Sequence, residues 1–265
     1  MRLKISYSTH YSFADPVTYG LQQLRMTPKT SPSQKVLSWG IEIEGGKKEV
    51  TYEDYHRNRV DLISFDAGTT SLEVKVEGEV EISESHGIVG PHIGCAPLWL
   101  YQRHTPRTRV GQGCREIIRG VSGETDLARM HALSHAIGAA VAYETGTSDV
   151  EWGAEEVLTA GRGVCQDHAH VFLACARNMG LPARYVSGFL MMNDRIEQNA
   201  THAWAEVHID GLGWVGFDIS NEICPDERYV RVATGLDYSQ AAPVTGMRVG
   251  GTTESLDVAI LVAQQ

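Results

Sequence analysis

No hydrophobic run in the chain is long enough to span a membrane. Its 265 residues are 42% hydrophobic, yet no segment approaches the roughly 20 consecutive apolar residues that a bilayer requires. The first residues, MRLKISYSTHYSF, alternate between apolar and polar and do not resemble a signal peptide. We therefore expect a cytoplasmic protein without a membrane partner.

The chain also has no surplus of positive charge. Its formal net charge is -10, whereas proteins that bind nucleic acids or anionic membranes present a basic surface. We therefore do not expect nucleic acid as a partner. The length allows one large domain or two ordinary ones.

The cysteines form neither a disulfide nor a zinc pattern. There are five of them, widely spaced: Cys95, Cys114, Cys165, Cys175 and Cys224. An odd, scattered set favours a reduced cytosol of the bacterial type over a disulfide framework. No C-x-x-C pair is present, and the spacing of His86, His92 and Cys95 matches no zinc site. We expect no metal and no cofactor.

Alternating residues predict that the first hundred positions are mainly β-structure. In SLEVKVEGEVEI, residues 71–82, apolar residues alternate with charged ones, as in a strand with one buried and one exposed face. RLKISYSTHYSF, residues 2–13, shows the same period of two. TPKTSPSQ reads as a break between strands, and EGGKKE as the tip of a hairpin. We predict a β-sandwich-like N-terminal domain over residues 1–95.

The middle of the chain changes from strand to helix patterns. Residues 84–113 are rich in glycine and proline and mark the candidate connection between domains. Beyond them, apolar residues recur at helical spacing after Thr125 and Asp126, which are suited to cap a helix. A second, shorter helix is expected to open at Ser148 or Asp149.

A third helix leads into the last strands. It is expected to start at Cys165 and to end near Gly180, because Pro182 cannot continue it. Three strand-like segments follow, with a tight DGLG turn between the last two: ARYVSGFLMM, THAWAEVHID and GWVGFDIS. Helices followed by antiparallel strands predict an α+β domain over residues 96–265.

Cys165 differs from the other cysteines in its position. It stands at a predicted helix start, where free N–H groups and the helix dipole favour an anion such as a thiolate. Gly161 and Gly163 precede it and allow a tight turn that leaves the sulfur accessible. Cys175, in the middle of the same helix between two alanines, is expected to be a buried and inert residue.

A metal site at Cys165 is the first alternative to a nucleophile. His168 and His170 lie close to the cysteine in sequence. On a helix with 3.6 residues per turn, however, His170 points about 140° away from Cys165. The helix then supplies two ligands at most, so a metal site is less favoured than a nucleophilic cysteine.

A nucleophilic cysteine needs a base and a group that orients the base. The hairpin THAWAEVHIDGLGWVGFD offers both, because His202 begins one strand and Asp218 ends the next. The two are expected to face each other, with a bulge absorbing their unequal distance from the turn. His208 lies beside the turn and far from Asp218. The sequence therefore predicts a triad of Cys165, His202 and Asp218.

These residues resemble a known family. GVCQDHAHVFLACARNMGLPARYVSGF, THAWAEV and GWVGFD, in this order, resemble the catalytic core of the transglutaminase-like superfamily, and the β-rich N-terminal part resembles its bacterial branch. The resemblance implies a papain-like fold. It also implies that Cys165 is the nucleophile, His202 the base and then the acid, and Asp218 the residue that orients the imidazole.

Two departures from the family pattern concern loops. The family commonly has Asp-Pro-Thr-Asn after the last strand, whereas this chain has DISN, which keeps Asn221. The usual Asp–Gly–Asn turn of the N-terminal domain appears here as DYHRN, without its glycine. The tail over residues 235–251 resembles the family's C-terminal extension, which often shapes the rim of the site. Asp167 and Asn221 are expected mainly as caps.

The expected reaction is acyl transfer from an amide through a thioester. Hydrolysis of a peptide or a glutamine-type amide is favoured over transamidation, so the partners are a peptide or protein substrate and, in the alternative, an amine acceptor. The backbone N–H of Cys165 and one more donor, with Trp152 as a candidate, would stabilise the oxyanion. Three tryptophans are candidates to line a slot for the amine: Trp152, Trp204 and Trp214.

Two other functions stay open. One is an acyltransferase that uses coenzyme A. Against it, the arginines near the site are scattered in sequence, and a basic cluster for the phosphates is not evident: Arg162, Arg177 and Arg184. The other is a binding module without activity, which the complete set of three triad residues disfavours.

Overall fold

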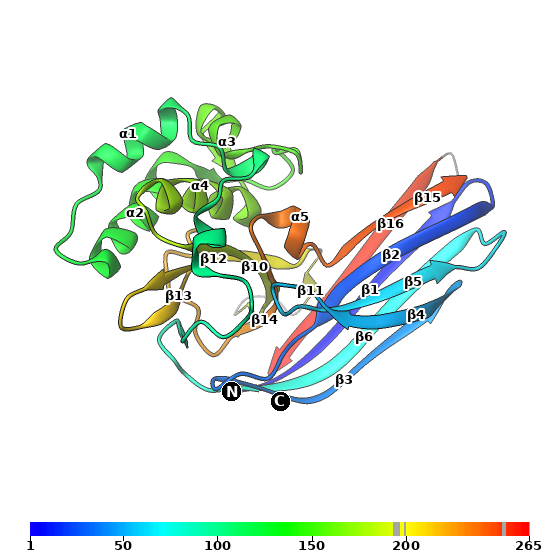
Figure 1. The fold of residues 1–265 in the computed structure, drawn as a ribbon. Coiled ribbons are helices and arrows are strands. Elements are labelled where there is room, and N and C mark those ends of the chain that lie inside the picture. The colour runs from blue at the N-terminus through cyan, green and yellow to red at the C-terminus, as the bar shows by residue number, and fades with distance from the viewer. Residues whose placement is uncertain (193–196, 199, 251–252, 265) are drawn as a thin grey trace.

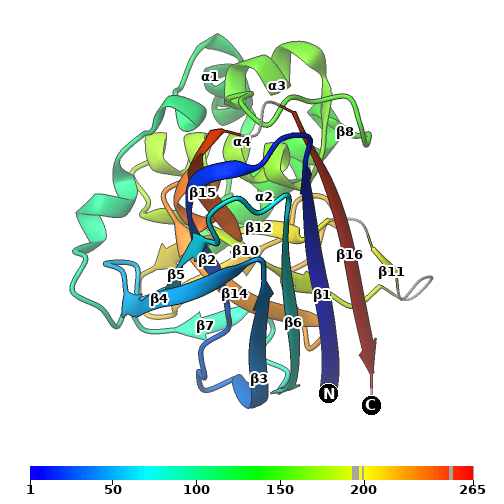
Figure 2. The same cartoon turned by 90° about the vertical axis from the view of Figure 1, so that its right-hand side faces the viewer.

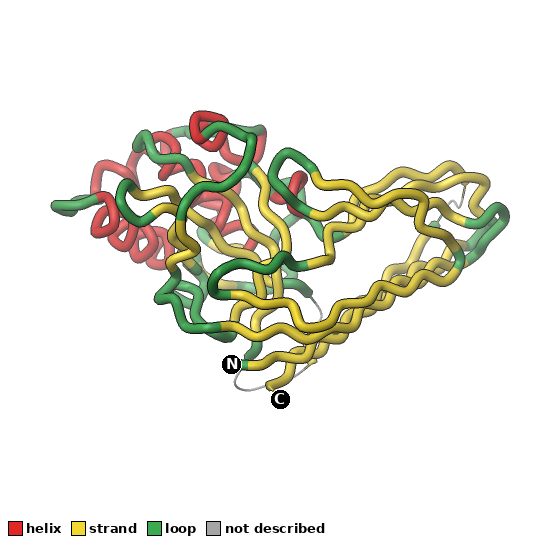
Figure 3. Tube along the Cα trace, turned by 60° about the horizontal axis from the view of Figure 1, so that its bottom comes forward, coloured by secondary structure: helices red, strands yellow, loops and turns green. Residues whose placement is uncertain are grey.

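The computed structural model describes residues 1–192, 197–198, 200–250 and 253–264, and it has two parts (Figure 1). Long strands form two sheets at one end of the molecule, and helices cover a further sheet at the other end, as the colouring in Figure 3 makes plain. The predicted combination of a β-rich N-terminal part with a helical, antiparallel-sheet core is confirmed.

Two sheets make up the β-rich part. Their strands run in the orders β11-β16-β1-β6-β3 and β15-β2-β5-β4. The strands are β1 (Arg2–Phe13), β2 (Val17–Thr27), β3 (Gln34–Glu44), β4 (Gly46–Glu53), β5 (Arg59–Phe65), β6 (Ser71–Ile82), β11 (Glu197–Gln198), β15 (Val244–Gly250) and β16 (Glu254–Gln264). The alternation predicted for β1 and β6 is confirmed, since every second side chain is buried.

The segment EGGKKE does not form a hairpin. It joins β3 to β4, and these strands belong to different sheets, so the predicted hairpin is wrong. Gly45, with a φ of 83°, lets the chain turn from one sheet to the other. Composition marks a turn at this place, but it does not determine which strand the next segment pairs with.

The C-terminal end of the chain returns to the β-rich part. Strand β16 pairs along the full length of β1, and β15 pairs with β2. Figure 2 shows β1 and β16 side by side, with the two termini at the same end. The tail that resembles a C-terminal extension therefore contains helix α5 (Tyr238–Ala241) and strand β15, while its last residue, Gly251, lies outside the described residues. The domain division at residue 95 stays a prediction.

The core consists of a sheet in the order β14-β10-β12-β13-β7 and of helices that cover it. Its strands are β7 (Ile88–Gly90), β10 (Ala183–Leu190), β12 (His202–Ile209), β13 (Gly213–Phe217) and β14 (Tyr229–Gly235). Its helices are α1 (Gln112–Gly120), α2 (Asp126–Ala140), α3 (Ala154–Ala160), α4 (Cys165–Asn178) and α5 (Tyr238–Ala241). Short elements complete it: η1 (Leu98–Gln102), η2 (Pro106–Thr108), β8 (Ala142–Tyr143) and β9 (Arg162–Gly163).

Helix α4 is the centre of the core. It packs on β10 and β12, with α2 and α3 against it, and its side chains from Asp167 to Arg177 are all buried. It begins and ends where predicted, with Gly180 in the left-handed conformation at φ 88°. The hydroxyl of Thr125 accepts the N–H of Ala128 and caps α2, also as predicted.

Helix α3 starts later than the sequence suggested. It begins at Ala154 with Gly153 as its N-cap residue, so the expected start at Ser148 or Asp149 is wrong. The carboxylate of Asp149 instead accepts the N–H of Glu151 and caps a turn before the helix. An aspartate side chain accepts backbone N–H groups in a turn as readily as at the start of a helix, so the sequence did not distinguish the two at Asp149.

Gly188 offers a test of how tightly the core sheet is packed. A Cβ at this position would collide with the Val230 carbonyl and lie 2.7 Å from the Trp204 ring. Gly188→Ala should therefore lower the free energy of unfolding by about 1–3 kcal/mol, as overpacking does. Gly120→Ala, where no atom lies within 4 Å of the new Cβ, is the matched control and should not be destabilising. Urea unfolding measures both, and equal losses would contradict the packing described.

Candidate active site

Cys165 occupies the first position of α4, as predicted. The N-terminal turn is fixed by Asp167, whose Oδ2 accepts the N–H of Val164 at 2.8 Å, so its expected capping role is confirmed. A Cβ at Gly163 would lie 2.7 Å from the Asp167 side chain, which explains the glycine. Cys165 is partly exposed, and the backbone N–H groups at the very start of a helix have no acceptor within it. An anion at the sulfur or beside it is therefore favoured.

His202 begins β12 and connects the sulfur to the carboxylate. It pairs across the sheet with Gly188 of β10. Nε2 lies 2.6 Å from Oδ2 of Asp218, and the Cys165 side chain lies close enough to the same imidazole to raise its pKa. Because Nε2 is held by Asp218, Nδ1 is the nitrogen available to the thiol. The structure thus brings the three predicted residues together.

The geometry of the hairpin differs from the expectation in one respect. The β12–β13 register is regular from Ala205 opposite Phe217 down to the turn, so the predicted bulge is wrong. Continued by one step, this register sets Asp218 opposite Trp204, with His202 two residues further along the same face. The two side chains are therefore diagonal neighbours, a separation that long side chains bridge.

Several hydrogen-bond donors surround the Asp218 carboxylate. Besides His202, Oδ2 accepts the side-chain N–H of Asn221 and the hydroxyl of Tyr229, each at 2.7 Å. Oδ1 accepts the backbone N–H groups of Ser220 at 3.0 Å and Asn221 at 3.3 Å. Asn221 therefore anchors the carboxylate itself. A buried carboxylate is stable only when it is satisfied in this way.

Tyr229 was not predicted as part of the site. It comes from β14, which the sequence reading did not identify as a strand, and its ring contacts those of His202 and Trp204. Burial raises the pKa of the Tyr229 phenol, so the hydroxyl stays protonated and donates to Asp218. No spacing in the sequence relates Tyr229 to the hairpin, because β14 and β12 are brought together as the two neighbours of strand β10 in the sheet.

The charges of the triad support one another. Burial alone would lower the pKa of His202, but the negative charge at Cys165 and the hydrogen bond with Asp218 outweigh it and raise the pKa to about 10. Burial alone would raise the pKa of Asp218, but hydrogen bonds from His202, Asn221 and Tyr229 lower it below its ordinary value. The protonated form of the His202 imidazole is thus favoured beside the Asp218 carboxylate.

The two histidines of α4 serve other contacts. His168 donates from Nε2 to the Val141 carbonyl at 3.0 Å and accepts the Ser220 hydroxyl at Nδ1. His170 is buried elsewhere and accepts the N–H of Tyr238. The described residues contain no group of three side chains suited to a metal, and His168 instead ties α4 to the loop that holds Asp218.

The three candidate tryptophans have different surroundings. Trp204 is buried and stacks on the His202 ring. Trp214 lies near the other end of the sheet face, where it donates to His92 and is covered by Arg184. Trp152 is half-buried against the core, and its role as an oxyanion donor stays a prediction. Only Trp204 therefore has a contact with the triad that the structure records.

The three arginines considered above lie at different places in the structure. Arg177 is buried and donates to backbone carbonyls, including those of Ala183 and Leu236. Arg162 is exposed and lies 4.0 Å from Glu144. Arg184, by contrast, belongs to a group of basic side chains at a different place from the triad, described below.

Comparisons with known proteins identify the family of this chain. Residues 114–219 match the model of the transglutaminase-like superfamily, and residues 3–81 match that of the bacterial transglutaminase-like N-terminal region. The first range contains the cysteine, histidine and aspartate. The chain belongs to the transglutaminase-like superfamily, in the form with the bacterial N-terminal region.

Relatives of similar length also exist. An uncharacterized protein of Mycobacterium leprae is 27% identical over 99% of both chains. One of Mycobacterium tuberculosis is 27% identical over 98% of this chain and 91% of its own. The crystal structure of a proposed cysteine protease from Cytophaga hutchinsonii matches with a TM-score of 0.79 and 19% identity, covering 99% of this chain and 90% of that chain. At this identity the likeness shows the fold.

The pH dependence of alkylation should reveal the imidazolium. Because the start of α4 and the protonated His202 ring both favour an anion at the sulfur, the rate of iodoacetamide labelling at Cys165 should rise less steeply between pH 6 and pH 8 than that of an ordinary thiol. An ordinary thiol should accelerate roughly a hundredfold over this interval, as its thiolate fraction rises. Peptide-resolved mass spectrometry measures both rates in one sample, with the exposed Cys95 as internal reference. Parallel acceleration of the two cysteines would contradict an activated pair.

Proposed function

We propose that the protein is a cysteine-dependent amidohydrolase that cleaves a peptide bond or a glutamine-type side-chain amide. One observation carries the proposal: the His202 ring is hydrogen-bonded to a buried carboxylate at 2.6 Å, and the sulfur at the start of α4 lies close enough to the same ring to raise its pKa. This arrangement has the parts that nucleophilic acyl transfer requires, namely a nucleophile, a base and an orienting acceptor.

The reaction follows from the charges of the triad. The Cys165 thiolate attacks the amide carbonyl, and the negative charge that forms on oxygen is stabilised by the backbone N–H of Cys165 at the helix start. The His202 imidazolium donates its proton to the leaving nitrogen, which departs as ammonia or an amine and leaves a thioester. Asp218 holds the ring in the tautomer that this step needs.

Hydrolysis of the thioester completes the cycle. Water attacks the acyl carbon while His202, now neutral, accepts a proton from it. The thiolate leaves, the carboxylic acid is released, and the imidazolium is restored. Cys165 is partly exposed, so water reaches the sulfur, and this favours hydrolysis over transfer to an amine. Of the predicted slot residues, Trp204 is buried beneath His202 and offers no open surface for an amine.

Product analysis of glutamine-containing peptides tests the proposal. Wild-type protein should release ammonia or peptide fragments, and Cys165→Ala or His202→Ala should reduce the rate at least about a thousandfold. His208→Ala is the matched control, because His208 lies on the same strand and face and contacts Trp214. Its rate should stay within a few-fold of wild type.

A primary amine added to the same assay separates hydrolysis from transamidation. Mass spectrometry distinguishes the free acid from the amine-linked product, and the proposal predicts mainly the acid. Predominant amine incorporation would replace hydrolysis by cross-linking. Equal loss in the His202 and His208 variants, or undiminished activity of Cys165→Ala, would contradict the proposed mechanism altogether.

A further inference from the structure

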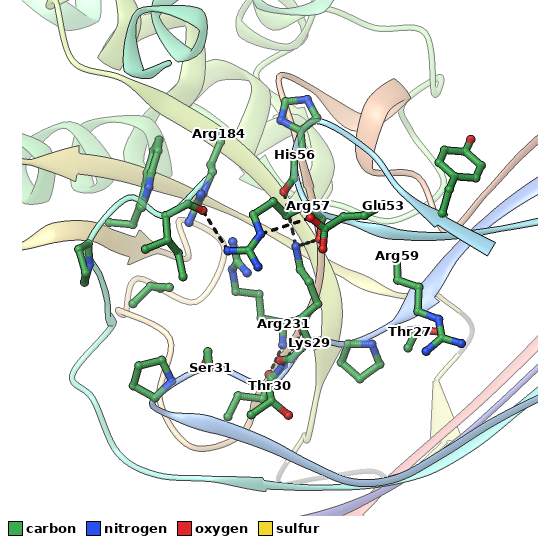
Figure 4. Close-up of a pocket in the computed structure, with 18 of the residues that line it drawn as sticks. Thr27, Lys29, Thr30, Ser31, Glu53, His56, Arg57, Arg59, Arg184 and Arg231 are labelled. Carbon is green, nitrogen blue, oxygen red and sulfur yellow. Dashed lines mark hydrogen bonds and ion pairs between the residues drawn. The ribbon is translucent and has the colours of Figure 1, made fainter. Parts of the chain in front are cut away.

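A cavity of about 600 Å³ lies at a different place from the triad, between the loops of the β-rich part and strands β10 and β14. Its volume is in the range of pockets that hold small organic ligands. Figure 4 shows the basic side chains that converge on it from both parts of the chain. Its cationic lining residues are Lys29, Arg57, Arg59, Arg184 and Arg231, and Glu53 is the acidic one among the described residues. We call it the basic cavity.

The basic cavity is distinct from the candidate active site. None of the triad residues lines it. In the β10–β12 register Arg184 lies opposite Glu206, whereas Gly188 lies opposite His202. Four residues along a strand correspond to about 13 Å. A ligand bound by the residues of the basic cavity would therefore not contact the Cys165 sulfur.

Positive charge in the cavity is only partly neutralised. Arg184 and Arg231 both bind the carboxylate of Glu206, each at 2.6 Å, and that carboxylate is completely buried. Two guanidinium groups thus share one negative charge. The Arg184 guanidinium also lies 3.8 Å from the centre of the Trp214 ring, which holds it in place. In a chain of net charge -10, such a concentration of cations is unexpected without a partner.

Lys29 adds a cation without a carboxylate partner. Its ammonium donates to the carbonyls of His56 and Arg57, and the described residues include no carboxylate within ion-pair distance of it. Burial and the neighbouring charge of Arg231 lower the pKa of Lys29 to about 7, while Glu53 opposes them only in part. A buried ammonium in this state is stabilised by an added anion.

Arg57 stands where the backbone favours glycine. Its φ of 64° lies in the left-handed region, which disfavours residues with a Cβ. Arginine does not stabilise this backbone conformation better than glycine would, so the contribution of Arg57 lies in its guanidinium group. It reaches the Glu53 carboxylate at 3.4 Å and the Ile93 carbonyl at 3.4 Å, at the rim of the cavity.

Two side-chain amides hold the loops that carry Lys29 and Arg57 in place in the absence of a ligand. Gln34 bonds both backbone groups of Arg231, accepting its N–H and donating to its carbonyl at 2.8 Å, and it also donates to the Lys29 carbonyl. Asn58 bonds the backbone of Thr234 in the same manner, at 2.9 and 2.7 Å. The loops that carry Lys29 and Arg57 are thus clamped to strand β14. A preformed site loses less entropy on binding.

We propose that the basic cavity binds a small organic polyanion, a molecule that carries phosphate or carboxylate groups. Guanidinium groups pair with both through two parallel hydrogen bonds, and an ammonium adds a point charge. Apolar residues at the rim, Val89, Ile93 and Tyr52, provide contact for the uncharged part of such a molecule. The site does not depend on the proposed amide hydrolysis, and it requires no turnover.

Calorimetric titration with pyrophosphate and with citrate tests the proposal. Wild-type protein should bind at least one of them saturably, with a Kd below about 1 mM, and the comparison identifies phosphate or carboxylate as the preferred group. Lys29→Gln, which keeps an N–H donor but removes the charge, should weaken binding at least about tenfold. Arg57→Gly should do the same and, because glycine suits the left-handed backbone, should not lower the unfolding temperature.

Arg119→Gln provides the matched control. Arg119 is exposed on α1, at the helical end of the molecule (Figure 1), and does not line the basic cavity. This variant therefore loses the same charge without altering the site and should bind as wild type does. Equal affinity of all four proteins would mean adventitious binding to the surface and would overturn the proposal. So would the absence of saturable binding of both probes by the folded wild-type protein.

Discussion

The hydrogen bond between His202 and Asp218 is the interaction on which the rest of the site depends. A carboxylate as deeply buried as Asp218 is stable only because five donors surround it. Those donors come from three places: the start of β12, the loop after β13 and the beginning of β14. Through Ser220 the same loop also holds His168 and hence the N-terminal half of α4. The carboxylate therefore connects the strand that carries His202 to the helix that carries Cys165.

The edge of the core sheet has a second organising role. Strand β14 ends the sheet order on one side, and unpaired backbone groups on such an edge must find partners. Gln34 at the start of β3 and Asn58 in the loop between β4 and β5 supply them from the β-rich part. The same clamps set Lys29 and Arg57 beside Arg231, so the contact that closes the sheet edge also creates the basic cavity. In this way the N-terminal part does more than support the core.

Local patterns in the sequence were sufficient for most elements, and contacts between distant segments were not. The alternation in residues 71–82 and the helical spacing from Asp126 onward depend on neighbours in sequence, so both predicted their elements. The triad was predictable because its base and carboxylate lie on one hairpin, although their diagonal offset was not. Tyr229 and the basic cavity could not be predicted, since Lys29 and Arg231 approach each other only after the sheets assemble. The crossover at Gly45 was missed for the same reason.

The central claim is that His202 is an imidazolium held between a thiolate and a carboxylate, and NMR titration of its ring tests this most directly. The signal is assigned with His202→Ala and followed with pH in wild type and in Cys165→Ser, which removes the negative charge of the sulfur. The account predicts a pKa of about 10 in wild type and a clearly lower value in the serine variant. A ring that titrates near the ordinary value of about 6.5 in both proteins would contradict the account.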